Sequence, residues 1–360
     1  MNKRTFLKQV GLTAFAAGQS SQLLQAKPVL PEKTAKTLKN WVWINPDHKE
    51  SAEVLTERYK KYKAHGITGI FFEADDEKHF TIAKKQGLTT HRWIWTLNRG
   101  EESLLKAHPE WYAINRKGES CADKPPYVGY YRWLCPSRPE VRNYLENVVK
   151  TELSKPYVDG IHLDYVRYCD VILAVNLWQV YGIKQNQELP EYDFCYCEVC
   201  QQKFKEKKGI DITKVENPDQ NLSWRKFRYD NVTRLVNHLA ETAKSFKKPI
   251  SAAVFPTPEV AKRIVRQDWV NWNLNLVCPM IYHKFYKEDV SWIGDAVEEG
   301  VKALHGKFPL YAGLYLPDFD SNEEITQGIK LAIKNGAAGI SLFGNVNDDV
   351  LKALVKGVNS

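Results

Sequence analysis

The sequence contains no uninterrupted apolar run of 18 residues, the length that a helix needs to cross a bilayer. It also lacks a glycine-rich phosphate loop, a serine nucleophile elbow and a His-Glu-x-x-His motif. These absences argue against a membrane span, nucleotide-dependent chemistry, the common type of acyl transfer and zinc proteolysis. Although the formal net charge is +8, basic residues are dispersed along the chain, so nucleic acid is not an expected partner.

Aromatic residues, in contrast, are abundant. The chain has 360 residues, of which 43% are hydrophobic and 26% charged, as in a globular protein with a large core. It holds eleven Trp, and aromatic residues make up 12% of the sequence. Besides filling a core, such flat apolar rings suit stacking on the faces of sugar rings. The length fits one (β/α)₈ barrel with insertions.

The first 26 residues have the order of an export signal. Lys3 and Arg4 precede an apolar run from Val10 to Ala17, and small and polar residues follow up to Ala26. Residues 2–8 also resemble a twin-arginine signal in which Lys3 replaces the first arginine. We therefore expect a periplasmic or secreted protein with one folded domain over residues 27–360.

Eight short apolar segments are predicted strands, most of them followed by a helical pattern. They are residues 41–45, 69–73, 91–97, the segment that ends at Asp164, and residues 250–255, 276–282, 310–315 and 339–343. This alternation predicts a parallel sheet, and eight units predict its closure into a TIM barrel. Two long insertions, residues 98–137 after the third strand and 169–222 after the fourth, leave the rim where barrels build their active sites. We expect both to line the site.

The fourth predicted strand ends in a cluster of charged side chains. Ile161 and Leu163 form its apolar body, and His162, Asp164 and Arg167 gather at its C-terminal end. Such a cluster is typical of the active site of a barrel enzyme. The alternative is a buried Asp164–Arg167 ion pair that only fixes a loop.

Several pieces of sequence resemble the glycosyl-hydrolase-like family 10. The pieces are His108-Pro109-Glu110-Trp111, Gly118, Leu134-Cys135-Pro136, Pro139-Glu140-Val141-Arg142, residues 158–165 and Pro279-Met280-Ile281-Tyr282. The resemblance implies an exported bacterial TIM barrel that is remotely related to the α-amylase-like glycosidases. The chain departs from the family pattern twice, because Asp164 is the one acidic residue before Tyr165 and Cys169 stands where many relatives have proline.

The end of the fourth strand is also similar to two glycosidase patterns. In the chitinase-like pattern Asp-Gly-x-Asp-x-Asp-x-Glu, the catalytic acid would fall at Val166, which cannot donate a proton. In the α-amylase-like pattern, a nucleophilic Asp follows a basic residue two positions earlier, and His162 and Asp164 match that spacing. We prefer the second interpretation.

Glycoside cleavage needs two carboxyl groups, and Asp164 is the first candidate. Glu73, at the end of the second predicted strand, is the preferred partner, ahead of Asp75, Asp318 and Asp320.

Two basic neighbours bear on these roles. Arg167 would keep Asp164 ionised, which suits a nucleophile. An ion pair of Glu73 with Arg92 or Arg99 is as consistent with the sequence as a catalytic role.

Further residues at predicted strand ends are candidates for substrate binding. They are Trp43, Asn45, Trp95, Asn98, Arg99, Trp133, His162, Arg167, Tyr282 and His283. The aromatic residues either stack on sugars or pack the rim, and each histidine either binds hydroxyls or is a satisfied core residue. Arg99, Arg132 and Arg167 would suit an acidic sugar. We expect a glycoside hydrolase that acts on a carbohydrate without a cofactor; the alternative is a catalytically silent glycan-binding barrel.

Three of the seven cysteines, Cys195, Cys197 and Cys200, lie close together in the sequence. With Cys169 they could supply four zinc ligands, but a second ligand pair at matching spacing is missing. A disulfide or free structural thiols fit an exported protein better, so no metal site is assigned. The sequence gives no indication of the oligomeric state.

Overall fold

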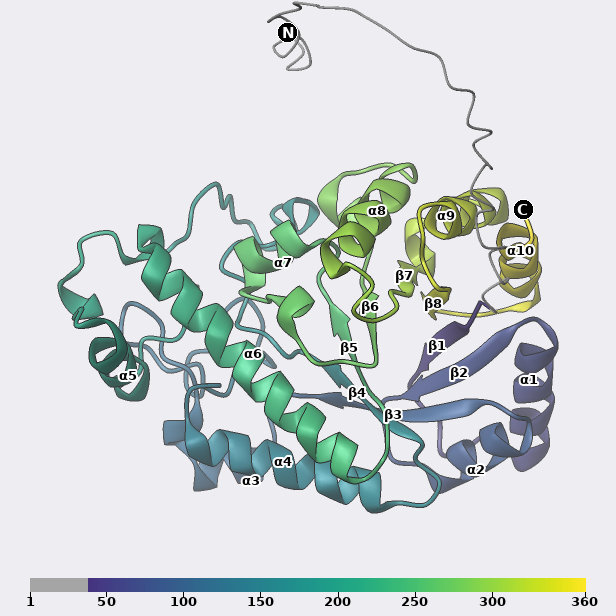
Figure 1. The fold of residues 1–360 in the computed structure, drawn as a ribbon, viewed down its shortest axis with the longest axis horizontal. Coiled ribbons are helices and arrows are strands. Elements are labelled where there is room, and N and C mark those ends of the chain that lie inside the picture. The colour runs from purple at the N-terminus through teal and green to yellow at the C-terminus, as the bar shows by residue number, and fades with distance from the viewer. Residues whose placement is uncertain (1–37) are drawn as a thin grey trace, which may run out of the picture. The chain divides into compact units, whose positions relative to one another are not determined.

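The computed structural model describes residues 38–360, so the export signal predicted for residues 1–26 lies outside the described part. Eight parallel strands with helices between them form the predicted TIM barrel (Figure 1). Their order is β6-β5-β4-β3-β2-β1-β8-β7. Parallel bridges from Val277 to Leu310 and from Met280 to Gly313 bring the two edges together, so the barrel is nearly closed.

Each strand lies within a few residues of its prediction. The strands are β1 (Asn40–Ile44), β2 (Ile67–Phe72), β3 (Thr89–Trp95), β4 (Gly160–Asp164), β5 (Ile250–Val254), β6 (Leu276–Pro279), β7 (Ala312–Tyr315) and β8 (Ile340–Phe343). The helices are α1 (Ala52–Ala64), α2 (Glu77–Lys85), α3 (Glu102–Ala107), α4 (Pro139–Ser154), α5 (Glu198–Lys208), α6 (Leu222–Ser245), α7 (Pro258–Val265), α8 (Trp292–Leu304), α9 (Asn322–Lys334) and α10 (Asp348–Val358). No helix within these residues is both long and apolar enough to cross a membrane.

The inside of the barrel is packed with aromatic side chains. Residues two apart along a strand share a face, so Trp41 and Trp43 of β1 both point inward. They form one buried cluster with Phe71 of β2 and Trp93 of β3. This cluster fills the inside of the barrel and extends toward the C-terminal rim.

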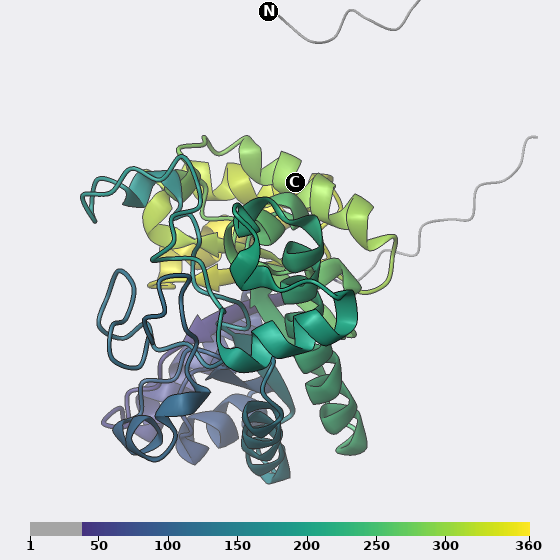
Figure 2. The same cartoon turned by 90° about the vertical axis from the view of Figure 1, so that its left-hand side faces the viewer.

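The two insertions pack against each other at one end of the barrel. An isolated β-bridge joins Asn115 to Phe194, and the backbone N–H of Tyr196 donates a 2.7 Å hydrogen bond to the carbonyl of Ile114. Figure 2, in which this end faces the viewer, shows their loops side by side. The insertions therefore form one continuous wall rather than two independent loops.

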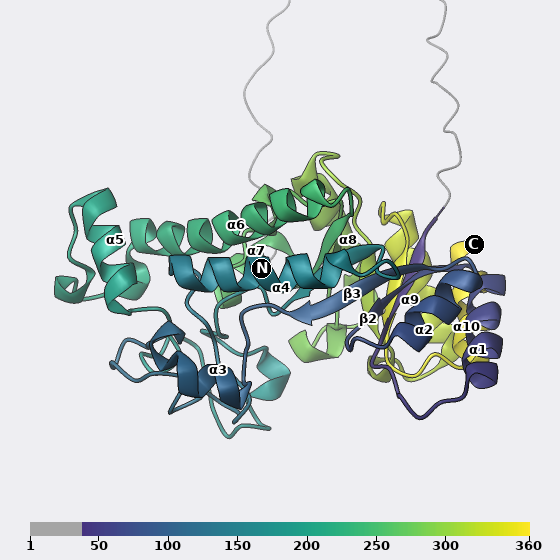
Figure 3. The ribbon, with the colours of Figure 1, turned by 90° about the horizontal axis from the view of Figure 1, so that it is seen from below.

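Helices α4 and α6 connect this wall to the barrel. They lie side by side, and α6 extends beyond the strands to reach α5 (Figure 3). Pro139 opens α4 at a position where a missing backbone N–H costs nothing, as the sequence predicts. Helix α4 then leads directly into β4, and so fixes the strand that ends at Asp164.

Candidate active site

A cavity of about 430 Å³ opens at the C-terminal ends of the strands. It is lined by residues from the strand ends, the loops that follow them and both insertions. They are Trp43, Asn45, Glu73, Trp93, Trp95, Tyr131, Asp164, Tyr165, Arg167, Asp170, Ala174, Leu177, Ala253, Phe255, Met280, Tyr282, Phe285, Tyr286 and Phe343. The lining is therefore mainly aromatic, with three carboxyl groups and one guanidinium.

Asp164 is the last residue of β4 and is almost completely buried. Its Oδ2 accepts a 3.0 Å hydrogen bond from the indole N–H of Trp93, and its Oδ1 accepts one of 2.6 Å from the backbone N–H of Tyr165. Burial raises the pKa of Asp164 from its usual 3.8 to about 6, although these two donors and the charge of Arg167 lower it. The carboxyl group is thus both oriented and tuned to titrate near neutral pH.

Tyr165 adopts a left-handed backbone conformation, with φ of 49°. Such a conformation is strained for a residue with a side chain, and it is common at functional sites. Here it turns the chain sharply after β4, so that the Tyr165 N–H points back at Asp164 while its ring packs 4.5 Å from that of Trp95.

Glu73 directly follows β2 and lies two positions beyond the inward-facing Phe71, so it shares that face. It is half-buried, and burial raises its pKa against the opposing effects of Trp95 and Arg92. The ion pair considered from the sequence is not formed, because Arg92 pairs with Glu152 at 3.3 Å and Arg99 pairs with Glu101 at 2.9 Å.

Glu73 and Asp164 line the same cavity, and their charges are coupled. The negative charge of Glu73 raises the pKa of Asp164, which places the two groups within electrostatic reach of each other. The structure therefore brings together the two carboxyl groups that the sequence selected from different strands.

Arg167 does not pair with Asp164, contrary to the alternative considered from the sequence. It forms a buried ion pair with Asp170, with an N···O distance of 2.8 Å. Its guanidinium also lies 4.6 Å from the Trp133 ring centroid and 4.9 Å from that of Phe255. The charge of Arg167 lowers the pKa of Asp164, as the sequence suggested, but burial outweighs this effect and the pKa of Asp164 rises to about 6.

Four of the other predicted contacts lie around the cavity. Trp43 and Trp95 contribute from β1 and β3, Tyr282 follows β6, and Asn45 follows β1 with an exposed side chain. The Tyr282 ring packs 5.2 Å from that of Tyr315, so it is held by a neighbouring aromatic side chain. Two indoles, a phenol and an amide thus surround the carboxyl groups.

The structure does not bring Asn98, Arg99 and Trp133 into this cavity. Asn98 and Arg99 line a second hollow of about 350 Å³, which shares Glu73 and Trp95 with the first. Trp133 is buried beneath Arg167, where it packs the rim instead of presenting a face to ligand. Among the three arginines expected for an acidic sugar, Arg167 alone lines the cavity.

His162 lies inside the barrel, below the cavity. Its Nε2 accepts a 2.9 Å hydrogen bond from the Trp43 indole, so its Nδ1 carries the proton and donates to Ser251 Oγ at 2.8 Å. The ring stacks on Phe71 at 3.8 Å, and burial holds its pKa well below the usual 6.5. His162 is thus a core histidine with both ring nitrogens hydrogen-bonded, which is one of the two interpretations that the sequence allowed.

His283 is also buried and lies outside the cavity lining. Its nearest carboxylate is Asp318, with an N···O distance of 3.9 Å, and its ring packs on Phe319 at 5.0 Å.

The lower-ranked candidates for the second catalytic carboxyl group, Asp75, Asp318 and Asp320, also lie outside the cavity lining. Asp75 binds Lys155, and Asp320 binds Lys284.

Sequence reasoning missed several residues of the cavity. Asp170 and Leu177 come from the second insertion and Tyr131 from the first, and Phe285 and Tyr286 follow β6. The insertions carried no periodic pattern that would place single side chains, so the one available signal was that both leave the catalytic rim. Both insertions contribute residues to the lining of the cavity.

The described residues bring metal-binding side chains together at one place, a buried cluster of Cys135, Cys195, Cys197 and Cys200. None of the four lines the cavity. All seven cysteines of the chain are buried and free, which agrees with the free thiols, and not with the disulfide, that the sequence allowed.

Comparison with known proteins agrees with this architecture. The sequence profile of the family described as Glycosyl hydrolase-like 10 matches residues 75–304. No curated protein sequence matches the chain.

Several solved structures share the fold. The glycoside hydrolase domain of PgaB (BpsB) from Bordetella bronchiseptica has a TM-score of 0.64 and 12% identity, over 89% of this chain and 98% of that one. The catalytic domain of a beta-amylase from Paenibacillus polymyxa has a TM-score of 0.60 and 11% identity, over 90% and 95% of the two chains. A beta-galactosidase from the psychrophilic Marinomonas ef1 also has a TM-score of 0.60 and 11% identity, over 89% of this chain and 59% of that one.

Proposed function

Because the chain belongs to the glycosyl hydrolase-like 10 family, we propose that it hydrolyses glycosidic bonds of a poly- or oligosaccharide, with Asp164 and Glu73 as the catalytic carboxyl groups. One observation carries this proposal. Glu73 and Asp164 come from different strands, yet they line one cavity, and the charge of Glu73 raises the pKa of Asp164. Glycoside hydrolysis requires such a pair, whereas sugar binding alone does not.

The environments of the two groups suggest their roles. With a pKa of about 6, about one tenth of Asp164 is protonated at pH 7 and about half at pH 6, and this form can protonate the leaving oxygen. Glu73 is less buried and acts as the nucleophile, or as the base that activates water. This assignment reverses the role that the sequence suggested for Asp164.

The aromatic lining supports a carbohydrate substrate. Trp43, Trp95 and Tyr282 offer flat apolar surfaces for sugar rings, and the Asn45 amide can both donate to and accept from hydroxyl groups. Two solved structures with the same fold are named as a beta-galactosidase and a beta-amylase, both of which act on sugars. We further propose, from residues 1–26 alone, that the protein is exported to the periplasm or secreted through a twin-arginine-like or general export signal.

The test is turnover of a panel of polysaccharides by the purified protein, with product analysis. Asp164→Asn and Glu73→Gln should each lower kcat at least about 1,000-fold, a loss typical of essential catalytic groups, while the affinity for product oligosaccharide stays within a few fold. Asp75→Asn is a matched control. It removes a carboxyl group two residues from Glu73 that binds Lys155 outside the cavity, so turnover should be unchanged.

Two outcomes would contradict the hydrolase proposal. One is wild-type protein that binds an oligosaccharide tightly without cleaving any member of the panel, which is the result expected of a glycan-binding barrel. The other is an active enzyme whose kcat survives both substitutions. If turnover is found, the anomeric form of the first product decides whether Glu73 acts as nucleophile or base, because retention requires a covalent intermediate.

A further inference from the structure

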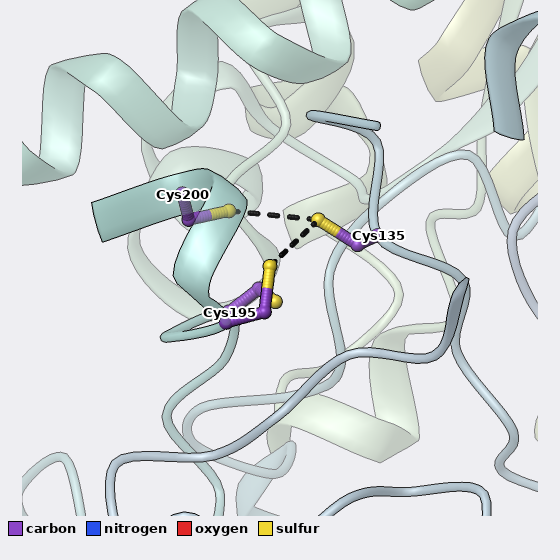
Figure 4. Close-up of side chains that lie close together, drawn as sticks. Cys135, Cys195 and Cys200 are labelled. Atoms are coloured by element: carbon purple, nitrogen blue, oxygen red, sulfur yellow. Dashed lines mark hydrogen bonds between the residues drawn. The ribbon is translucent and has the colours of Figure 1, made fainter. Parts of the chain in front are cut away.

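We propose that Cys135, Cys195, Cys197 and Cys200 bind one structural zinc ion that joins the two insertions. The four sulfur atoms all lie within 4.8 Å of one another, and all four side chains are buried. Figure 4 shows Cys135, Cys195 and Cys200 gathered at one place, with the sulfur atom of Cys200, on a helix, directed toward that of Cys135. This cluster is separate from the cavity, so the proposal does not depend on the proposed catalysis.

The spacing of the sulfur atoms fits tetrahedral coordination. Cys135 Sγ lies 3.5 Å from Cys200 Sγ and 3.7 Å from Cys197 Sγ. Four thiolates at about 2.3 Å from a zinc ion lie roughly 3.8 Å from each other, whereas two sulfur atoms in a disulfide are about 2.05 Å apart. A set of four sulfur ligands in this geometry is characteristic of zinc or of iron–sulfur sites.

The chain presents these thiols at a favourable position for negative charge. Cys197 is the N-cap of α5 and Cys200 lies in its first turn. Unpaired backbone N–H groups and the helix dipole stabilise anions at a helix N-terminus, and thiolates are the form that binds zinc. Cys195 reaches the same point from the preceding loop, and Cys135 comes from the other insertion, 62 residues before Cys197.

Neighbouring groups orient two of the sulfur atoms. The backbone N–H of Ile114 donates to Cys195 Sγ at 3.4 Å, and Ser137 Oγ lies 3.2 Å from Cys200 Sγ. Ser137 is itself held by Asn231, whose Nδ2 donates to Ser137 Oγ at 2.5 Å. Outer contacts of this kind are typical of built metal sites, where they fix the ligands before the ion binds.

The fourth ligand differs from the one considered from the sequence. Cys169 is buried elsewhere, with its sulfur 3.8 Å from the carbonyl oxygen of Asp170, and it is not part of the cluster. Cys135 takes its place because the two insertions pack against each other, a contact that sequence spacing alone does not reveal.

Zinc at this position would be structural. Four protein ligands leave no open coordination position for substrate or water. The ion would join the end of residues 98–137 to the segment before α5, and the joined wall supplies Tyr131 and Asp170 to the cavity. Loss of the ion should therefore loosen this wall.

The first experiment uses the full chain, purified without chelators, with elemental analysis of zinc and iron. We expect about one zinc per chain, as for a structural site with four thiolates. Alkylation after denaturation with chelator, but without reductant, should modify all seven cysteines. Disulfides among the four cysteines, iron in place of zinc, or metal-free protein that takes up no added zinc would each overturn the proposal.

Variants then assign the ligands. Cys135→Ser and Cys200→Ser should each lose most of the zinc, whereas Cys169→Ser and Cys278→Ser remove buried thiols outside the cluster and should keep it. If the first two variants do not fold, Co²⁺ loaded into the wild-type chain should give the visible spectrum of a tetrahedral cobalt thiolate. Full zinc retention in the Cys200→Ser variant, or a cobalt spectrum without thiolate bands, would contradict the assignment.

Discussion

The indole N–H of Trp93 donates a 3.0 Å hydrogen bond to Oδ2 of Asp164, so a tryptophan on β3 orients the carboxyl group at the end of β4. The two strands are adjacent, and in their register Trp95 is the partner of Asp164 while Trp93 is the partner of His162. Trp93 lies two residues before Trp95 on β3, so its side chain reaches the carboxyl group from deeper in the barrel. This contact gives a direct way to change the acidity of Asp164 without removing it.

Replacement of Trp93 by Phe should raise the pKa of Asp164 above its value of about 6, because the hydrogen bond favours the carboxylate. One hydrogen bond contributes about 1 kcal/mol, or roughly 0.7 pKa unit. If Asp164 is the catalytic acid, activity falls as pH rises through this pKa, and the falling limb should move to higher pH by about that amount. The measurement is the pH profile of kcat.

Trp41→Phe provides the matched control for this shift. Trp41 lies on the bottom of the same barrel, and its indole N–H has no hydrogen-bond partner within the described residues. The pH profile of this variant should match that of the wild type. An equal shift in both variants would show that the effect does not come from the bond to Asp164.

The raised pKa of Asp164 also predicts how the free energy of unfolding changes with pH. The folded protein binds the proton more tightly than an unfolded chain, whose carboxyl pKa is near 3.8, so protonation stabilises the fold. The free energy of unfolding should fall by about 3 kcal/mol from this group as pH rises from about 3 to about 7, and Asp164→Asn should lack this component. Urea denaturation of both proteins across this range isolates the difference. Parallel curves would show that Asp164 has an ordinary pKa in the folded protein.

The buried ion pair of Arg167 and Asp170 should affect stability mainly because each charge neutralises the other. Arg167→Met leaves the Asp170 carboxylate buried without its partner, which costs about 3–5 kcal/mol of unfolding free energy. The double variant Arg167→Met with Asp170→Asn should recover most of this loss, because no unpaired charge remains. Chemical denaturation of the three proteins completes the comparison. Equal stability of the single and double variants would mean that stacking on Trp133, rather than the ion pair, holds Arg167 in place.

Two tryptophans that the sequence made candidates for substrate binding should respond differently to truncation. Trp95 lines the cavity, so Trp95→Ala should weaken oligosaccharide binding by about tenfold, equivalent to roughly 1.4 kcal/mol of stacking. Trp133 is buried under Arg167, so Trp133→Ala should instead cost about 3–5 kcal/mol of stability. Calorimetric binding and thermal denaturation of both variants separate the two effects. A binding defect confined to the Trp133 variant would reverse these assignments.

Much of the barrel could be predicted because its rules act over short distances. Strands and helices alternate along the chain, and residues that end parallel strands meet at one rim. The positions of Glu73 and Asp164 in the sequence therefore predict that both lie at this rim. The family match over residues 75–304 confirms the resemblance that the sequence pieces between His108 and Tyr282 indicate. The depth of a side chain within the barrel was harder to predict. His162 and Asp164 face the same way, but only the packing of Phe71 and Trp43 shows that the histidine lies below the cavity.

The remaining errors come from contacts between segments that are distant in sequence or joined by irregular loops. Arg167 was assigned to Asp164 because the two are close along the chain, yet it pairs with Asp170 after the loop turns at Tyr165. In the same way, Cys135 joins the cysteines of the second insertion only because the two insertions fold together. Neither pairing follows from periodicity or spacing, since loops have no regular geometry to extrapolate.

The ion pair of Arg167 with Asp170 also determines the net charge that the cavity lining presents to a substrate. The charges of Arg167 and Asp170 offset each other within this ion pair. The remaining carboxyl groups of the cavity lining are those of Glu73 and Asp164, so they determine how a charged substrate would interact with the cavity. A sugar that carries its own carboxylate would meet charge of the same sign, and no free guanidinium of the lining would offset the repulsion. If the cavity binds sugars as proposed, uncharged and amine-bearing sugars face no such barrier, and the cavity would discriminate by charge before any hydroxyl group is recognised.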